Sequence, residues 1–201
     1  MVVVQEENLI WLMPDNHPQL SDAELVIRTQ RNPKAFDELY NRYVDPIFRY
    51  CNRRLTRAAA EDATSITFLK ALRSINTFNP EQGGFRPWLF TIAHNAIIDQ
   101  LRARNHAPID DFEFQESGPS LEDLVIEADN RRRLRHAMRS LPPDQQHVIH
   151  LRLASLTSPE IATVMGKKPG SVRVLQHRAV KELRRLLGAE SVRASDTGEQ
   201  L

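Results

Sequence analysis

The sequence predicts an all-α protein of two small helical domains joined by an acidic flexible linker. Apolar residues recur at helical spacing along most of the 201 residues, whereas almost no segment alternates apolar and polar residues over the length of a strand. Residues 109–129 hold eight carboxylates and no Lys or Arg, a composition typical of a tether. The last folded segment has the pattern of a helix-turn-helix.

The chain is expected to open with an arm and two helices. Residues 1–20 show no periodic pattern, which indicates a flexible arm. Ser21 and Glu24 have the spacing of a capping box, which predicts that a short helix begins there. Pro33 suits the first position of the next helix, because a proline there removes no helical hydrogen bond.

Two more helices complete a first domain over residues 21–104. Residues 58–75 have apolar side chains on several sides, which predicts a helix with more than one neighbour. A turn-rich loop follows at residues 79–84. Residues 86–104 place their apolar side chains on one face of a fourth helix.

The second domain is predicted over residues 121–187, after a linker of residues 105–120 and before a tail of residues 188–201. Helical periodicity predicts its first two helices at about residues 121–140 and 144–154.

The helix-turn-helix occupies the end of this domain. Thr157 and Glu160 have capping-box spacing for a short helix, and Gly166 closes it at a position that tolerates a positive φ. The Pro-Gly pair at residues 169–170 is expected to break the chain before a second helix at residues 171–187.

This second helix is predicted to have an apolar stripe and a basic face. The stripe comprises Val172, Leu175, Ala179, Leu183 and Leu186, and the opposite face has Arg173, His177, Lys181 and Arg184. Residues 129–187 contain thirteen Lys or Arg against four Asp or Glu, which favours nucleic acid as a partner. The alternative is the ordinary solvated face of a bundle helix.

Composition excludes several classes of protein. Cys51 is the single cysteine, so no disulfide framework is expected and a reducing cytoplasm is the predicted location. No apolar run approaches the roughly 20 residues that span a bilayer, so membrane insertion is not expected. No phosphate loop, metal-ligand cluster or nucleophile motif is present, so neither an enzyme nor a cofactor is predicted.

Several strings of residues occur in an order that identifies a family. In the first domain they are residues 35–40 (AFDELY), 60–62 (AED), 67–71 (TFLKA) and 85–95 (FRPWLFTIAHN), with Asp99 and Arg102. In the second they are residues 141–143 (LPP), 148–149 (VI), 160–162 (EIA), 171–173 (SVR) and 177–179 (HRA), with Gly166. The chain resembles bacterial sigma factors of the extracytoplasmic-function (ECF) group, which lack a third domain between these two.

The resemblance implies a dissociable subunit of RNA polymerase. The first domain would bind the polymerase clamp and would recognise and open the promoter minus-10 element. The second would bind the minus-35 element and the polymerase flap, and the linker would run toward the RNA exit path. An anti-sigma factor is implied as a further partner.

The resemblance also implies roles for individual residues. The candidates for binding core polymerase are Tyr40, Arg49, Asp62, Phe68 and Lys70. The candidates for the minus-10 element are Phe78, Asn79, Thr91, His94, Asn95, Ile98 and Arg102. The candidates for the minus-35 element are Lys167, Lys168, Ser171, Arg173, His177, Arg178 and Lys181.

Some assignments leave alternatives open. Phe68 could equally pack in the core of its domain, and Trp88 is interpreted as a core residue. His94 stands where the family more often has Arg, and a neutral imidazole weakens a phosphate contact. A helix-turn-helix repressor or activator without sigma function is the alternative for the whole chain.

Overall fold

The computed structural model describes residues 20–80, 83–104 and 132–196. All regular structure in these residues is helical, which confirms the predicted all-α class. The predicted linker and all but Leu20 of the predicted N-terminal arm lie outside the described residues. Residues 197–201 of the predicted tail and residues 121–131 of the first predicted helix of the second domain lie outside them too. Residues 132–139 of that helix are described and helical. None of the described helices is long and apolar enough to cross a membrane.

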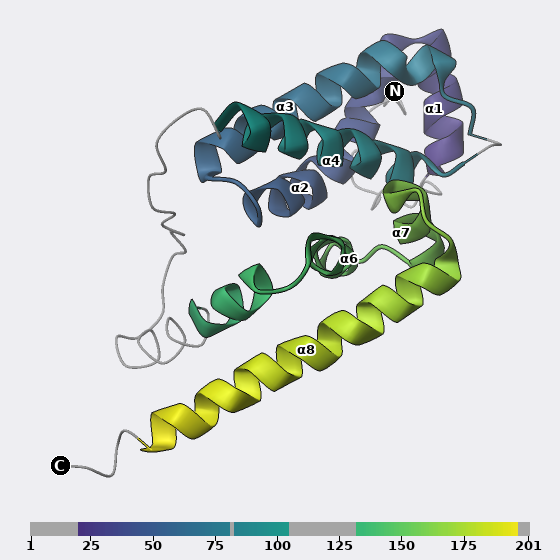
Figure 1. The fold of residues 1–201 in the computed structure, drawn as a ribbon. Coiled ribbons are helices and arrows are strands. Elements are labelled where there is room, and N and C mark those ends of the chain that lie inside the picture. The colour runs from purple at the N-terminus through teal and green to yellow at the C-terminus, as the bar shows by residue number, and fades with distance from the viewer. Residues whose placement is uncertain (1–19, 81–82, 105–131, 197–201) are drawn as a thin grey trace, which may run out of the picture.

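Residues 20–104 form an N-terminal module of four helices (Figure 1). Ser21 caps α1 (Asp22–Arg31), and the reciprocal bond from its backbone amide to Glu24 completes the predicted capping box. A 3₁₀ turn, Pro33–Ala35, precedes α2 (Phe36–Asn52), so the proline begins this turn and not the α-helix itself. Thr56 caps α3 (Arg57–Ser74), a second 3₁₀ turn follows at Ile75–Thr77, and α4 is Phe85–Arg104.

The core of the N-terminal module forms where α3 meets α2 and α4. The packing face of α3 is made of small side chains, including the fully buried Ala60 and Ala63, so the neighbouring helices approach closely. The hydroxyls of Thr64 and Thr67 on this face donate to the carbonyls four residues earlier, which satisfies these buried donors. Cys51 of α2 is fully buried in this core.

The C-terminal module comprises residues 132–139, α6 (Pro143–Leu153), α7 (Ser158–Met165) and α8 (Pro169–Asp196). Thr157 and Glu160 form the predicted capping box of α7, and Gly166 ends the helix in the left-handed conformation at φ 60°. The expectation that residues 169–170 break the chain is wrong, because they are the first residues of α8. A proline is compatible with the first turn of a helix, since its missing amide would have no helical acceptor there.

The two modules pack against each other through α4 and α7 (Figure 1). In the figure, α7 lies between the first turns of α8 and the first half of α4, and α8 extends away from the N-terminal module. Direct packing between α4 and α7 therefore contributes to the relative position of the two modules.

Gly166→Ala should lower the free energy of unfolding by about 1 kcal/mol, because an L-residue is strained at positive φ. No atom lies within 4 Å of the added Cβ, so the loss would report backbone strain alone. Urea denaturation followed by circular dichroism measures the change.

Gly170→Ala is the matched control. A Cβ added at this glycine also meets no atom within 4 Å, but the residue lies in the first turn of α8 without a positive φ. Alanine is the better helix former, so the control should be neutral or stabilising by about 0.5 kcal/mol. Equal destabilisation by both substitutions would contradict the account of Gly166.

Candidate DNA and polymerase interfaces

The outer face of α8 is basic and open to solvent. Val172 and Ala179 are fully buried and anchor the helix to the rest of its module. The predicted minus-35 candidates on this helix are all exposed; they are Ser171, Arg173, His177, Arg178 and Lys181. The structure therefore brings these five candidates together on one accessible surface.

One arginine side chain fixes α8 relative to the helices before it. Arg152 of α6 donates from Nη1 to the Leu156 carbonyl at 2.9 Å and from Nη2 to Ser158 Oγ at 2.7 Å. The same Nη2 donates to Gln176 Oε1 of α8 at 2.9 Å. This half-buried fork joins α6, the start of α7 and α8, so it holds the basic face in a defined orientation.

The two lysines before α8 differ in their surroundings. Lys167 is half-buried, and its Nζ lies 3.0 Å from Asp144 Oδ2 of α6. Lys168 is exposed at the start of the helix, where a cation can reach a DNA phosphate. Of this pair, Lys168 is the more available for the predicted phosphate contact.

Helix α4 exposes only part of its predicted minus-10 set. Asn95 and Arg102 are exposed, and Thr91 and Ile98 are half-buried. The Thr91 hydroxyl donates to the Pro87 carbonyl of its own helix at 2.9 Å. Asn95 and Arg102 are therefore the two members that solvent or DNA can reach freely.

Phe78, at the start of the predicted minus-10 loop, belongs to an aromatic cluster. Its ring centroid lies 4.7 Å from that of Trp88 and 6.1 Å from that of Phe85. Gln30 of α1 donates to the Phe78 carbonyl at 2.9 Å and fixes the backbone there. Phe78 and Trp88 are each partly buried, so both contribute to packing and both keep some accessible surface, while Asn79 beside them is exposed.

His94, the remaining minus-10 candidate on α4, is covered by the C-terminal module. Its ring stacks on that of His147 of α6, with centroids 3.8 Å apart and an interplanar angle of 14°. The hydroxyl of Tyr50 on α2 contacts both rings, at 3.4 Å from His94 Nδ1 and 3.1 Å from His147 Nε2. In this arrangement His94 contacts protein where the sequence predicts a DNA contact.

Hydrogen bonding and burial both keep this histidine pair neutral. Arg54 Nη1 lies 3.1 Å from His94 Nδ1, and a guanidinium can only donate, so this nitrogen accepts and is unprotonated. Burial, followed by the charge of Arg54, lowers the pKa of His94 to about 4. Burial also holds the pKa of His147 far below its usual range, and positive charge on His94 and Arg54 would lower it further.

A second polar contact joins the modules at the start of α4. Arg86 Nη2 donates to the Ala154 carbonyl at 2.8 Å, and Arg86 Nη1 lies 3.8 Å from Glu160 Oε1 of α7. Both charged side chains are less than one-third exposed, so solvent screens the pair only in part.

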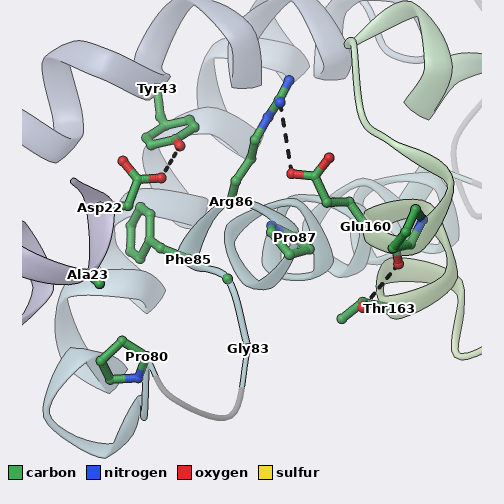
Figure 2. A pocket seen from close by; sticks show the side chains of 12 residues that line it. Asp22, Ala23, Tyr43, Pro80, Gly83, Phe85, Arg86, Pro87, Glu160 and Thr163 are labelled. Atoms are coloured by element: carbon green, nitrogen blue, oxygen red, sulfur yellow. Dashed lines mark hydrogen bonds and ion pairs between the residues drawn. The ribbon is translucent and has the colours of Figure 1, made fainter.

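A cavity of about 540 Å³ adjoins this ion pair, with walls from both modules (Figure 2). Tyr43, Phe85 and Arg86 line it from the N-terminal module, and Glu160 and Thr163 from α7. Tyr43 donates its hydroxyl proton to Asp22, which also accepts from Arg42, so these lining groups already have partners. The cavity lies beside the predicted minus-10 loop and is walled by α7 in this arrangement.

The outer side of α2 and α3 presents an apolar surface with an acidic end. Asp62 is exposed on α3, and Leu69 and Leu72 on the same helix are 54% and 38% exposed. Asp62, Ser65, Leu69 and Leu72 are spaced 0, 3, 7 and 10 residues along the helix, which places them on one face. We call these four residues the α3 face.

The other predicted polymerase contacts lie in different positions. Phe68 is only 5% exposed and packs edge-on against Tyr40, with ring centroids 4.7 Å apart, so it supports the 43% exposed Tyr40. Lys70 is exposed, with Nζ 3.5 Å from Asp99 of α4. Arg49 is exposed but lies nine residues from Tyr40, about half a turn around α2, so the two project on opposite sides.

Two family models match the chain over these surfaces. Residues 39–107 match sigma-70 region 2, and residues 131–183 match sigma-70 region 4. The sigma factor CarQ of Myxococcus xanthus is 32% identical over 159 residues, which cover 77% of this chain and 90% of CarQ. The chain belongs to the sigma-70 family, in its ECF group.

Two relatives that are named ECF sigma factors support the membership of this chain in the ECF group. BldN of Streptomyces coelicolor is 42% identical over 171 residues, or 82% of this chain, although the match spans only 65% of BldN. The sigma-E factor of Haemophilus influenzae is 31% identical over 175 residues, or 80% of this chain and 92% of that protein.

Solved structures show the same fold at low identity. CnrH, in complex with the cytosolic domain of CnrY, has a TM-score of 0.66 at 23% identity and covers 84% of this chain and 97% of its own. The sigma factor RpoE of Bartonella quintana, in complex with the anti-sigma factor NepR, has a TM-score of 0.61 at 21% identity and covers 77% of this chain and 98% of its own.

The residues that the sequence-based prediction missed in this sigma factor fall into two groups. Leu69 and Leu72 could have been found from the sequence, because their spacing from Asp62 places all three residues on one helix face. No sequence pattern could have indicated His147, Arg86 and Glu160, because their contacts join helices that are far apart in the sequence.

Lowering the pH from 7.5 to 5 should separate the modules of this sigma factor. Burial lowers the pKa of His94 and of His150 to about 4, whereas an exposed imidazole titrates near 6.5. The open form therefore binds more protons below about pH 6.5, and closure is fully favoured only above it. Each such histidine shifts the equilibrium by up to about tenfold per pH unit between the two pKa values.

Small-angle scattering at several pH values measures this opening as a larger radius of gyration, with circular dichroism as the check that the helices persist. The groups that face the pair are Tyr50, Arg54, His150 and Lys167, so protonation meets mostly positive neighbours. His147→Phe keeps a ring against His94 but cannot titrate, and it should weaken the transition. A radius that does not change with pH would contradict this account.

Proposed function

We propose that this sigma factor binds core RNA polymerase in the cytoplasm and directs it to specific promoters, without catalysing a reaction itself. The exposed face of α8 binds the minus-35 element in the major groove, and Asn95 and Arg102 of α4 contact the minus-10 element. Phe78 and Asn79 receive a base that leaves the stack when the minus-10 element opens. The α3 face and Tyr40 bind the polymerase clamp, and the C-terminal module also contacts the flap.

One observation supports this function above the others: two different kinds of exposed surface occur on separate modules of one chain. The α8 face is cationic, which suits the phosphates and guanines of DNA. The α3 face has two exposed leucines beside a carboxylate, a composition that suits a protein partner better than DNA. A protein that recruits polymerase to DNA needs both surfaces.

We assign the packed arrangement to the sigma factor that is not bound to core polymerase. His94 cannot contact a base while it stacks on His147, and α7 forms one wall of the cavity beside the minus-10 loop. The energy of separating the modules must come from contacts with polymerase or promoter. Promoter binding by the free protein is therefore expected to be weak.

We also propose control by an anti-sigma factor that covers the α3 face. Exposed apolar residues gathered on one helix face are typical of a surface that a protein covers. NepR, an anti-sigma factor, binds RpoE, which has the same fold. Co-purification from cells at native expression tests this proposal, and recovery of only the free protein or the holoenzyme in unstressed cells would contradict it.

Run-off transcription tests the main proposal. Purified core polymerase is assayed with and without the protein over a library of promoter fragments, and new discrete transcripts should require both components. A helix-turn-helix repressor or activator would instead bind a defined operator tightly without polymerase and yield no such transcripts.

Arg173→Ala should weaken holoenzyme binding to the minus-35 element by about tenfold to a hundredfold, the usual contribution of an arginine bound to guanine. Binding to core polymerase should not change, which fluorescence anisotropy with labelled protein measures. Arg185→Ala is the control, because Arg185 is exposed on the same helix and paired with Glu182. Loss of polymerase binding as well would indicate misfolding or a wrong assignment.

Leu69→Ser should weaken binding to core polymerase by about tenfold, as expected when roughly half of a leucine is buried on docking. The helix should persist, because Leu69 is mostly exposed in the free protein. Ile27→Ser is the control, since Ile27 is 42% exposed on α1 outside the α3 face. Equal effects of the two substitutions in a competition assay would remove the α3 face from the proposed interface.

A further inference from the structure

The basic face of α8 contains one aliphatic side chain that its fold does not use. Val174 is 49% exposed, whereas Val172 two residues earlier is fully buried. Between Pro169 and Lys181, all of which the structure describes, Val174 is the one exposed large hydrophobic residue. A single exposed aliphatic residue is ordinary on a protein surface, so its position must decide whether it has a role.

Val174 lies near the middle of the exposed arc. At about 100° per residue, the arc runs from Arg173 through His177, Lys181, Val174 and Arg178 to Ser171 and covers about 160°. Val174 lies about 20° from its centre, and Lys181 at the centre is about two turns further along the helix. A residue near the centre of a recognition-helix face meets the base edges, while long cationic side chains nearer its rim can reach either phosphates or guanine edges. The flanking cations are placed for phosphates and guanines, and the valine is placed for a base edge.

The chemistry of the major groove then selects the base. Of the four bases, only thymine presents a methyl group there, and the other edges present hydrogen-bonding groups. An isopropyl group cannot pair with those polar groups and would leave them without water. Contact with a thymine methyl is therefore the most favourable base contact open to valine at this position.

We infer that Val174 recognises a thymine of the minus-35 element by contact with its C5-methyl group. The inference rests on the proposed function and makes it more specific. The flanking Arg173 and Arg178 then determine guanines, and Val174 adds a preference for thymine at a neighbouring position.

Deoxyuridine substitution tests the contact, because it removes only the methyl group. Holoenzyme assembled from core polymerase and the full chain is bound to a promoter fragment found by run-off transcription. Each thymine of the minus-35 element, on either strand, is replaced in turn by deoxyuridine, and competition binding gives the relative affinity. At one position the substitution should lower the affinity of the wild-type holoenzyme for the promoter about fourfold, which is the effect of one buried methyl group.

The Val174→Ala holoenzyme should lose this sensitivity at that one position and keep the wild-type response at every other thymine. Leu153→Ala is the matched control, because Leu153 is 56% exposed on α6 and outside the α8 face. Its holoenzyme should respond to deoxyuridine as the wild type does. Val174→Thr retains one methyl group at the same branch point and should keep part of the sensitivity.

Two results would overturn the inference, and they differ. If the holoenzyme binds its promoter but no thymine shows a response that depends on Val174, this inference fails and the proposed function stands. If the protein directs polymerase to no promoter, the proposed function fails and this inference fails with it.

Discussion

The two modules pack through α4 and α7, and this packing includes a buried, neutral histidine pair. His147 contacts the N-terminal module through two groups at once, since its ring stacks on His94 and its Nε2 lies 3.1 Å from the Tyr50 hydroxyl. The Arg54 guanidinium lies beside them, so a proton on either ring would place like charges together in a poorly hydrated space. Where α7 packs against α4, Arg86 and Glu160 add an ion pair and the cavity has its second wall.

Under the proposed function, module closure and promoter binding compete for the same residues. His94 and the surface around Arg86 lie against the C-terminal module, so DNA or polymerase can reach them only after separation. A ligand shifts such an equilibrium only through its preference for one state. The open form must therefore gain contacts that the closed form lacks, and the α4 surface beneath the interface can supply them. The exposed α8 face needs no such opening, so the first contact with a promoter can precede separation.

Local features are predictable from the sequence, whereas contacts between modules are not. The capping boxes at Ser21 and Thr157 and the left-handed Gly166 follow from short-range rules, and they are confirmed. The predicted break at Pro169 is wrong because a Pro-Gly pair satisfies two rules at once, that of a turn and that of a first helical turn. The contact between Tyr50 and His147 joins residues 97 positions apart, and no periodicity or motif signals such a pair.

The two sides of α8 separate stability from specificity. Val172 and Ala179 are fully buried, and Gln176 accepts from Arg152, so the inner side is fixed by packing and hydrogen bonding. The outer side contributes little to folding, because its side chains are exposed to water. Substitutions there can alter which bases the helix prefers without loss of the domain, whereas truncation of Val172 would leave a cavity. The exposed Val174 on that outer side is thus free of packing constraint, and under the inferred thymine contact its identity would be set by the promoter sequence alone.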